Sequence, residues 1–288
     1  MKFQISNFRL RAAFSLVEVL VVVSLMSLVV LALMAVFSST QRAFRSSVTQ
    51  SDVLEGSRAT MDMMAADLRA MAPSGGVSNI NTEPINFMVV ANGYGYTPLA
   101  QTLPGGSVQR TNLLNYFFVL GRENTKWMAT GYIVDTTSPS PLYPLYRFYA
   151  ETNVSFSPRL LFDQFQNYTY NAEWTNMSHL IDGVVHLTLH AYDTNGNWIN
   201  NYSQPYTNAL NTYLLPAAYG EAQFYMQSNT IPAAVELELG VLEDRTLQRA
   251  ESRPTDILRA QYLSGQSGTV HLFRQRVTIP NVDPTAYQ

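Results

Sequence analysis

The hydrophobic pattern begins with one long apolar run and continues with shorter runs of strand length. Residues 14–37 are 24 consecutive positions with a single charge, at Glu18. A helix rises about 1.5 Å per residue, so this run would measure about 36 Å, more than the roughly 30 Å hydrocarbon core of a bilayer. Its Phe, Leu and Val side chains favour insertion by about 5–10 kcal/mol, whereas one carboxylate opposes it by about 3 kcal/mol. We therefore expect a transmembrane helix over residues 14–37.

The helical pattern continues beyond this run. Residues 38–72 contain no proline, and Leu54, Met61 and Leu68 recur every seven positions as one stripe. The Pro-Ser-Gly-Gly sequence at 73–76 then ends the pattern. A Met-rich stripe of this kind is most simply explained by core packing. We expect residues 38–72 to be the amphipathic continuation of a single helix.

From residue 73 onward the apolar runs are short and separated by Gly, Pro and Asn. Such runs predict β-strands over residues 85–91, 113–120, 127–134, 145–150 and 269–279. We expect loops over residues 151–178 and 200–220, which are rich in aromatic residues and Asn, and a short helix over 255–263. Together these patterns predict an α+β fold, in which the long N-terminal helix packs on an antiparallel, β-rich head over residues 73–288.

Two segments of the head alternate apolar and polar positions with a period of two, which is typical of strands with one buried face. The first is Val184–Tyr192, and the pair Asn195-Gly196 after it predicts a hairpin with a type I′ turn. The second opens at Pro232 and places Glu236 and Glu238 outward. We expect its apolar side chains to face inward, namely Val235, Leu237, Leu239 and Val241.

Composition narrows the classes of function. Charged residues make up 14% of the chain, its formal net charge is −3 and it has no basic block, so we expect no nucleic-acid partner. Cysteine is absent, which excludes disulfides, thiolate metal sites and thiol nucleophiles. The sequence contains no G-x-S-x-G, P-loop or H-E-x-x-H motif. These absences favour neither an enzyme nor a cofactor, and we expect neither, although a catalytic triad assembled from residues distant in sequence stays open.

Two local patterns resemble metal sites, and we assign both of them other roles. His186 and His190 are four residues apart; on a helix they could share an ion, but on a strand this spacing is about 13 Å. We therefore expect them on a solvated strand face. Asp193, Asn195 and Asn197 resemble the start of a calcium loop, but the glycine stands at the fourth position instead of the sixth. A hairpin turn is the simpler interpretation, and we expect no metal site.

The residues before the apolar run indicate how the chain is oriented. Residues 1–13 carry Lys2, Arg9 and Arg11 and no acid, which predicts a cytoplasmic N-terminus with the bulk of the chain outside. A cleaved secretory signal peptide is the main alternative. Its apolar region would be only about 7–15 residues long, shorter than the run in this chain.

A short basic leader followed by Ala13-Phe14-Ser15-Leu16-Val17-Glu18 resembles the prepilin leader of type IV pilins and type II secretion pseudopilins. In that family a dedicated prepilin peptidase cuts on the cytoplasmic side of the apolar stretch and methylates the new N-terminus. The resemblance implies cleavage between Ala13 and Phe14, N-methylation of Phe14, and Glu18 as the fifth residue of the mature chain. The family usually has glycine before the cut, where this chain has Ala13.

Glu18 is the candidate assembly residue. Cleavage would create a free amine at Phe14, and the Glu18 carboxylate of a neighbouring subunit would pair with that amine in an apolar setting. Each charge then lowers the burial cost of the other. In the alternative interpretation, Glu18 merely favours the positive N-terminal end of its helix.

Within this group the chain is most similar to the J-type minor pseudopilins. The resemblance rests on residues 180–184 leading to Tyr192-Asp193, and on a later strand opened by Ile231-Pro232. The pilin-like family of Verru/Chthon cassette proteins, which shares the leader and a large outer domain, remains an alternative.

The resemblance implies a non-enzymatic subunit anchored in the inner membrane by one helix, with its head in the periplasm or outside the cell. Its expected partners are the prepilin peptidase and other pilin or pseudopilin subunits, and a large head suits the tip of a filament. One alternative is a minor type IV pilin of a surface pilus or DNA-uptake machine. Another is a membrane-tethered enzyme or carbohydrate-binding domain that uses the aromatic residues at 164–174 and 198–219.

Overall fold

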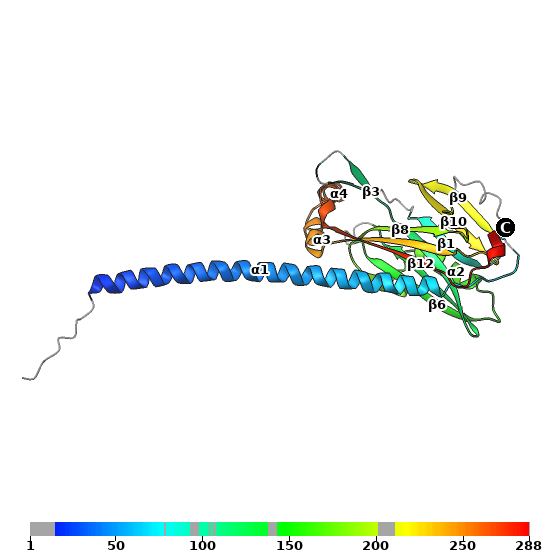
Figure 1. Cartoon of the computed structure of the whole chain (residues 1–288), viewed down its shortest axis with the longest axis horizontal. Helices are drawn as coiled ribbons and strands as arrows, with labels where there is room; N and C mark the ends of the chain where they lie inside the picture. Colours follow the sequence, from blue (N-terminus) through cyan, green and yellow to red (C-terminus); the bar gives the residue numbers. More distant parts are fainter. Residues whose placement is uncertain are drawn as a thin grey trace, which may run out of the picture. The chain divides into compact units, whose positions relative to one another are not determined.

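The computed structural model of the chain describes residues 15–77, 79–92, 98–103, 105, 108–137, 143–200 and 211–287 (Figure 1). It divides into two compact units, residues 1–49 and residues 50–288. The first unit holds the N-terminal part of one long helix. The second unit is a mixed α and β head, to which the C-terminal part of the same helix belongs.

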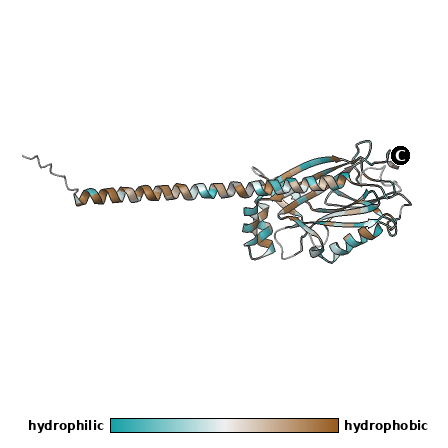
Figure 2. Ribbon diagram, turned by 90° about the horizontal axis from the view of Figure 1, so that it is seen from below, coloured by the Kyte–Doolittle hydropathy of each residue, from teal (hydrophilic) through white to brown (hydrophobic). Residues whose placement is uncertain are grey.

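The long helix is α1, Leu16–Arg69. Its side chains from Leu16 to Phe44 are all exposed, and the brown ribbon in Figure 2 shows how apolar this part is. A helix that is apolar on every side needs an apolar environment, and this stretch is long and apolar enough to cross a bilayer. Its hydroxyl groups donate back to carbonyls one turn earlier, which suits a region without water; examples are Ser24 to Val21, Ser27 to Val23 and Thr40 to Val36.

The head contains a seven-stranded sheet in the order β7-β6-β5-β4-β1-β10-β9. Neighbouring strands are antiparallel throughout. Their bounds are β1 Ile85–Ala91, β4 Asn115–Glu123, β5 Lys126–Val134, β6 Leu145–Asn153, β7 Ser178–Ile181, β9 Thr212–Ala218 and β10 Glu221–Gln227.

The other described elements form two smaller sheets and three short α-helices (Figure 1). A three-stranded sheet has the order β12-β11-β8, and β2 pairs with β3. The strands are β2 Leu99–Thr102, β3 Gln109–Asn112, β8 Val184–Tyr192, β11 Ala234–Leu242 and β12 Val270–Thr278. The helices are α2 Arg159–Tyr170, α3 Asp244–Glu251 and α4 Asp256–Ser264, with 3-10 turns at Trp174–Asn176, Ser267–Thr269 and Pro284–Tyr287.

The central strands of the large sheet are buried on both faces. One face packs against the end of α1 and the three-stranded sheet, through residues that include Met64, Leu68, Phe87, Phe117, Leu187 and Leu237. The opposite face packs against α2, through Phe118, Leu120, Phe148, Phe162 and Phe165. Strands covered on both sides need apolar residues at consecutive positions, which explains the apolar runs at 87–91 in β1 and 116–120 in β4. The stripe of Met61 and Leu68 faces this core as the sequence predicts.

A charged contact also joins α1 to the large sheet. Arg147 on β6 donates from Nε and Nη2 to the two carboxylate oxygens of Asp67 on α1, at 2.9 and 3.0 Å. The hydroxyl of Tyr132 on β5 donates to Asp67 Oδ2 at 2.5 Å. The two charged side chains are 20% and 16% exposed, so this contact lies mostly out of water.

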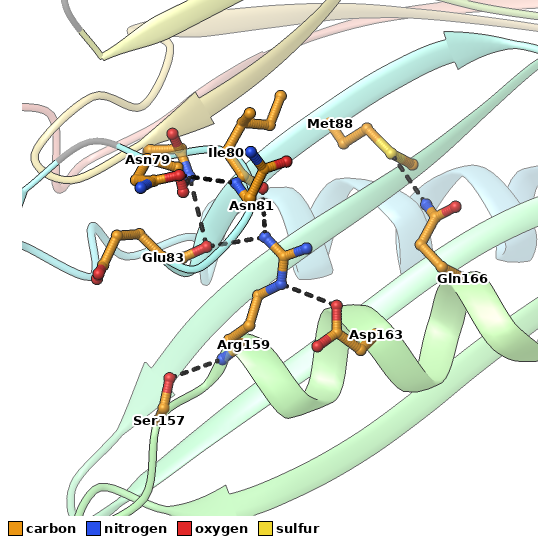
Figure 3. Close-up of polar contacts among 10 residues, drawn as sticks. Asn79, Ile80, Asn81, Glu83, Met88, Ser157, Arg159, Asp163 and Gln166 are labelled. Carbon is orange, nitrogen blue, oxygen red and sulfur yellow. Dashed lines mark hydrogen bonds and ion pairs between the residues drawn. The ribbon is translucent and has the colours of Figure 1, made fainter.

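Arg159 holds the start of α2 against the turn that precedes β1 (Figure 3). Its Nη1 donates to the carbonyls of Ile80 and Glu83, at 2.6 and 3.1 Å, and its Nε pairs with Asp163 at 2.8 Å. The N-cap residue of α2, Pro158, offers no side-chain cap, but Ser157 Oγ accepts the backbone N–H of Arg159 at 3.3 Å, so this bond and the Arg159 contacts together fix the start of the helix. Further along the helix, Gln166 donates to the sulfur of Met88 on β1.

Several sequence predictions need correction. Residues 151–178 are not all loop, because α2 lies within them and buries Leu161, Phe162 and Phe165 against the sheet. Residues 200–220 include β9, an edge strand that tolerates Pro216. The hairpin β2–β3 and helix α3 were also not predicted. The predicted strands over 85–91 and 127–134 are confirmed, and so is the short helix near 255–263, observed as α4.

Candidate functional site

The first turn of α1 carries the candidate assembly residue. The predicted cleavage residues, Ala13 and Phe14, lie outside the described residues. Glu18 Oε2 accepts hydrogen bonds from the backbone N–H of Ser15 at 2.9 Å and from its hydroxyl at 3.1 Å. In return, the backbone N–H of Glu18 donates to Ser15 Oγ at 3.2 Å. This reciprocal arrangement is a capping box, with Ser15 as N-cap and Glu18 three residues later.

The Ser-x-x-Glu pattern at 15–18 is the sequence signature of a capping box. The sequence prediction for Glu18 rested only on its charge and did not use this signal. Only one oxygen of the Glu18 carboxylate, Oε2, takes part in the capping box. Within the described part of the chain, Oε1 accepts no hydrogen bond and the carboxylate takes part in no ion pair. Glu18 can therefore cap its own helix and still offer one oxygen and its negative charge to a cation.

His186 is not on a solvated strand face, and that prediction is wrong for this residue. It is only 7% exposed, and its Nδ1 accepts the backbone N–H of Leu113 at 3.1 Å. Burial lowers the pKa of His186 to about 4, so the ring is neutral at physiological pH. Because Nδ1 is the acceptor, the proton of the neutral ring is on Nε2, which lies 3.3 Å from Thr188 Oγ1 and 3.6 Å from Glu238.

His190 joins the two larger sheets. Its Nε2 lies 2.7 Å from Glu221 on β10, and its ring packs edge-on against Trp198 with centroids 5.1 Å apart. The hydrogen bond to Glu221 raises the pKa of His190. Nearby on the same face, Arg274 pairs with Glu236 and Glu238. The charged side chains named here therefore pair with one another. The described residues contain no cluster of three or more His, Asp or Glu suited to a metal ion.

The segment after β8 forms the predicted turn, but of a different type. Asp193 Oδ1 accepts the backbone N–H groups of Asn195 and Asn197, at 2.9 and 2.7 Å. Gly196 has a φ of 81°, whereas Asn195 is not among the residues with positive φ. A type I′ turn needs positive φ at both central positions, so this is a type I turn followed by a glycine bulge. The Asp193 carboxylate thus serves the turn itself.

One of the two predicted aromatic segments borders a cleft. The cleft has a volume of about 370 Å³ and lies where the ends of β1, β5 and α2 meet. It is lined by Asn92, Tyr116, Ile133, Val134, Thr136, Thr137, Thr169, Tyr170, Ala172 and Trp174. The segment 164–174 supplies four of these residues. The segment 198–219 falls partly outside the described residues and contributes none of the described lining.

No protein-family model, no curated protein and no solved structure matches this chain. Its function is therefore inferred from its own residues and their geometry.

Proposed function

We propose that this protein is a non-enzymatic pilin-like subunit, a minor pseudopilin of a type II secretion pseudopilus or a related type IV filament. In this proposal it is processed by prepilin peptidase, held in the inner membrane by α1, and assembled near the filament tip. The observation that carries the proposal is the first part of α1. It is apolar on every side and has a single carboxylate, in its first turn.

The apolar surface of α1 suits two successive environments. In the membrane, side chains such as Leu20, Leu25 and Leu31 would face lipid. In a filament, the same side chains would face the equivalent helices of neighbouring subunits. Each such side chain is stabilised by about 1.5–3 kcal/mol when removed from water, and both environments provide that burial. An α1 of this composition would therefore move from lipid into a helical bundle without exposing apolar surface to water.

Glu18 would determine which helices can join that bundle, because it needs a cation from a neighbouring subunit. A carboxylate without a cation is costly in an apolar core, and a free amine at Phe14 of a neighbouring subunit would remove the cost. The capping box leaves Oε1 accessible for that amine. Removing one member of a buried charge pair typically costs about 3–5 kcal/mol, which is large enough to prevent incorporation into a filament.

The capping box makes it possible to test the charge separately from the helix cap. Glu18→Gln keeps a side chain that can complete the box but removes the charge. Ser15→Ala removes the hydroxyl partner but keeps the charge, and Glu18→Val removes both. The assay is co-purification of each variant with the other filament subunits, after membrane insertion has been confirmed.

If the ion pair matters, Glu18→Gln and Glu18→Val should both fail to incorporate while Ser15→Ala incorporates nearly normally. If Glu18 acts only as a helix cap, Glu18→Gln should behave like the unmodified protein and Ser15→Ala should share the defect of Glu18→Val. The second result would reject the assembly role.

Processing is tested independently by mass spectrometry of the mature N-terminus. In a host with an active prepilin peptidase, the chain should begin at Phe14 and carry one N-methyl group. Replacing Ala13 by glycine, the usual residue of the family at this position, should leave processing equal or better. An intact mass that retains residues 1–13 would reject the pilin-like proposal as a whole.

A further inference from the structure

The cleft at the ends of β1, β5 and α2 has the dimensions of a ligand site. Its volume of about 370 Å³ falls within the range of about 300–1,000 Å³ that is usual for small-molecule sites. Its lining comes from segments far apart in the chain: Asn92 follows β1, Thr136 follows β5, and Trp174 follows α2. A site assembled in this way is held by the fold itself.

One wall of the cleft is aromatic and held in a set orientation. Trp174 stacks on Tyr146, with ring centroids 5.3 Å apart and planes 13° apart. Tyr146 in turn meets the ring of His179 edge-on at 5.6 Å. Tyr170 is 72% exposed at the rim of the cleft. An aromatic surface that is already ordered loses little conformational entropy when it binds a ligand.

The polar groups of the cleft are neutral. None of the ten described residues that line it carries a charge. Asn92 is 5% exposed; its Nδ2 donates to the carbonyl of Val134 at 2.8 Å, while its Oδ1 accepts no hydrogen bond from any described residue. Thr169, in the same wall, has a buried hydroxyl without a described partner. Buried side chains nearly always pair their polar atoms, so the unpaired Oδ1 of the largely buried Asn92 gives the cleft a fixed acceptor that a ligand can use.

The backbone at the cleft is strained. Ala172 has a φ of 53°, in the left-handed region that glycine normally occupies. It terminates α2 in a Schellman arrangement, in which Glu173 N–H donates to the Tyr168 carbonyl at 2.9 Å and Ala172 N–H to that of Thr169 at 3.4 Å. Strain of this kind is concentrated at functional sites. The positive φ of Ala172 reverses the direction of the backbone after α2. As a result, Ala172 and Trp174 line the cleft together with Thr169.

We propose that this cleft binds an uncharged saccharide. The C–H face of a sugar ring would pack on the aromatic wall of Trp174 and Tyr170, because the faces of aromatic rings are negative and attract weakly positive C–H groups. The sugar hydroxyls would donate to Asn92 Oδ1 and exchange hydrogen bonds with Thr136. The absence of charge from the lining selects against acidic and basic ligands. This inference does not depend on the proposed role in a filament.

The test uses the full chain in a detergent without a sugar headgroup. The probes are glucose, galactose, N-acetylglucosamine, maltose, cellobiose, lactose and chitobiose, with glucuronate as a charged comparison. Binding is measured by saturation-transfer NMR on the sugar and by calorimetry. The variants are Tyr170→Ala, at an exposed position, and Trp174→Phe, which keeps an aromatic ring next to Tyr146. Phe156→Ala is the matched control, since Phe156 is 61% exposed and does not line the cleft.

At least one neutral sugar should bind saturably, and more tightly than glucuronate. Tyr170→Ala and Trp174→Phe should each weaken that binding about fivefold or more, whereas Phe156→Ala should leave it unchanged. The proposal is overturned if no neutral sugar binds at about 10 mM, a concentration that would reveal even millimolar affinity. It is equally overturned if glucuronate binds as well as the neutral sugars, or if both cleft variants bind like the unmodified chain.

Discussion

Replacing Asp67 by alanine should destabilise the head by about 2–3 kcal/mol. Asp67 is held by two parallel hydrogen bonds from Arg147 and by the hydroxyl of Tyr132. The substitution removes the acceptor of all three contacts and leaves the Arg147 guanidinium, mostly out of water between β6 and α1, without a carboxylate.

The magnitude follows from the burial of the pair. Breaking a fully buried ion pair by removing one partner costs about 3–5 kcal/mol, whereas an exposed pair contributes about 0–1 kcal/mol. The side chains of Arg147 and Asp67 are 20% and 16% exposed, so the cost falls between these two ranges and nearer the buried one, at about 2–3 kcal/mol. Burial alone would lower the pKa of Arg147, but its contacts with Asp67 and Tyr132 raise the pKa above its usual value. Removing Asp67 takes away part of that support, yet an arginine guanidinium is not deprotonated in proteins, so the cation remains without its carboxylate.

The assay is urea unfolding of the full chain, followed by tryptophan fluorescence, because Trp127, Trp174 and Trp198 all lie in the head. Asp62→Ala is the matched control, since Asp62 is an exposed acid one and a half turns earlier on α1. A double-mutant cycle with Arg147→Met should show a coupling of about 1–3 kcal/mol. An Asp67→Ala midpoint equal to that of Asp62→Ala, or a coupling near zero, would refute the reasoning.

Three further predictions concern single positions in the head. Ala172→Gly should raise the free energy of unfolding by about 0.5–1 kcal/mol, because glycine adopts a φ of 53° without strain; an unchanged or lower urea midpoint would contradict this. Gly131→Ala should lower it by about 1–3 kcal/mol, since the added Cβ would lie 2.5 Å from Phe165 Cε2; a midpoint equal to that of the unmodified chain would show that the ring moves freely. The raised pKa of His190 means that its pair with Glu221 stabilises the head fully below about pH 6.5 and progressively less as the pH rises through the folded-state pKa. The difference in unfolding free energy between the unmodified chain and Glu221→Gln should therefore shrink with rising pH, and a constant difference would exclude this ionic contribution.

Elements that depend on near neighbours could be predicted from the sequence alone. The apolar run at 14–37 specifies a membrane-length helix because insertion depends on the summed transfer energy of consecutive residues, and α1 has this apolar stretch. Ser15 and Glu18 meet because they are three residues apart on the first turn. The strand over 85–91 follows from its β-branched and apolar residues and the turns around it.

Features that depend on distant pairs were decided only by the tertiary structure. The helical spacing of Leu161, Phe162 and Phe165 is a local pattern, but only the tertiary structure shows which face of the large sheet they cover. His186 is buried instead of solvated because Leu113, distant in sequence, lies against it and donates its backbone N–H to the ring. The cleft combines Asn92, Thr136 and Trp174, which are brought together only when strands β1 and β5 meet the end of α2. Local patterns determine which elements form, whereas burial and the composition of a site depend on which elements pack together, and in this head those contacts join residues far apart in the chain.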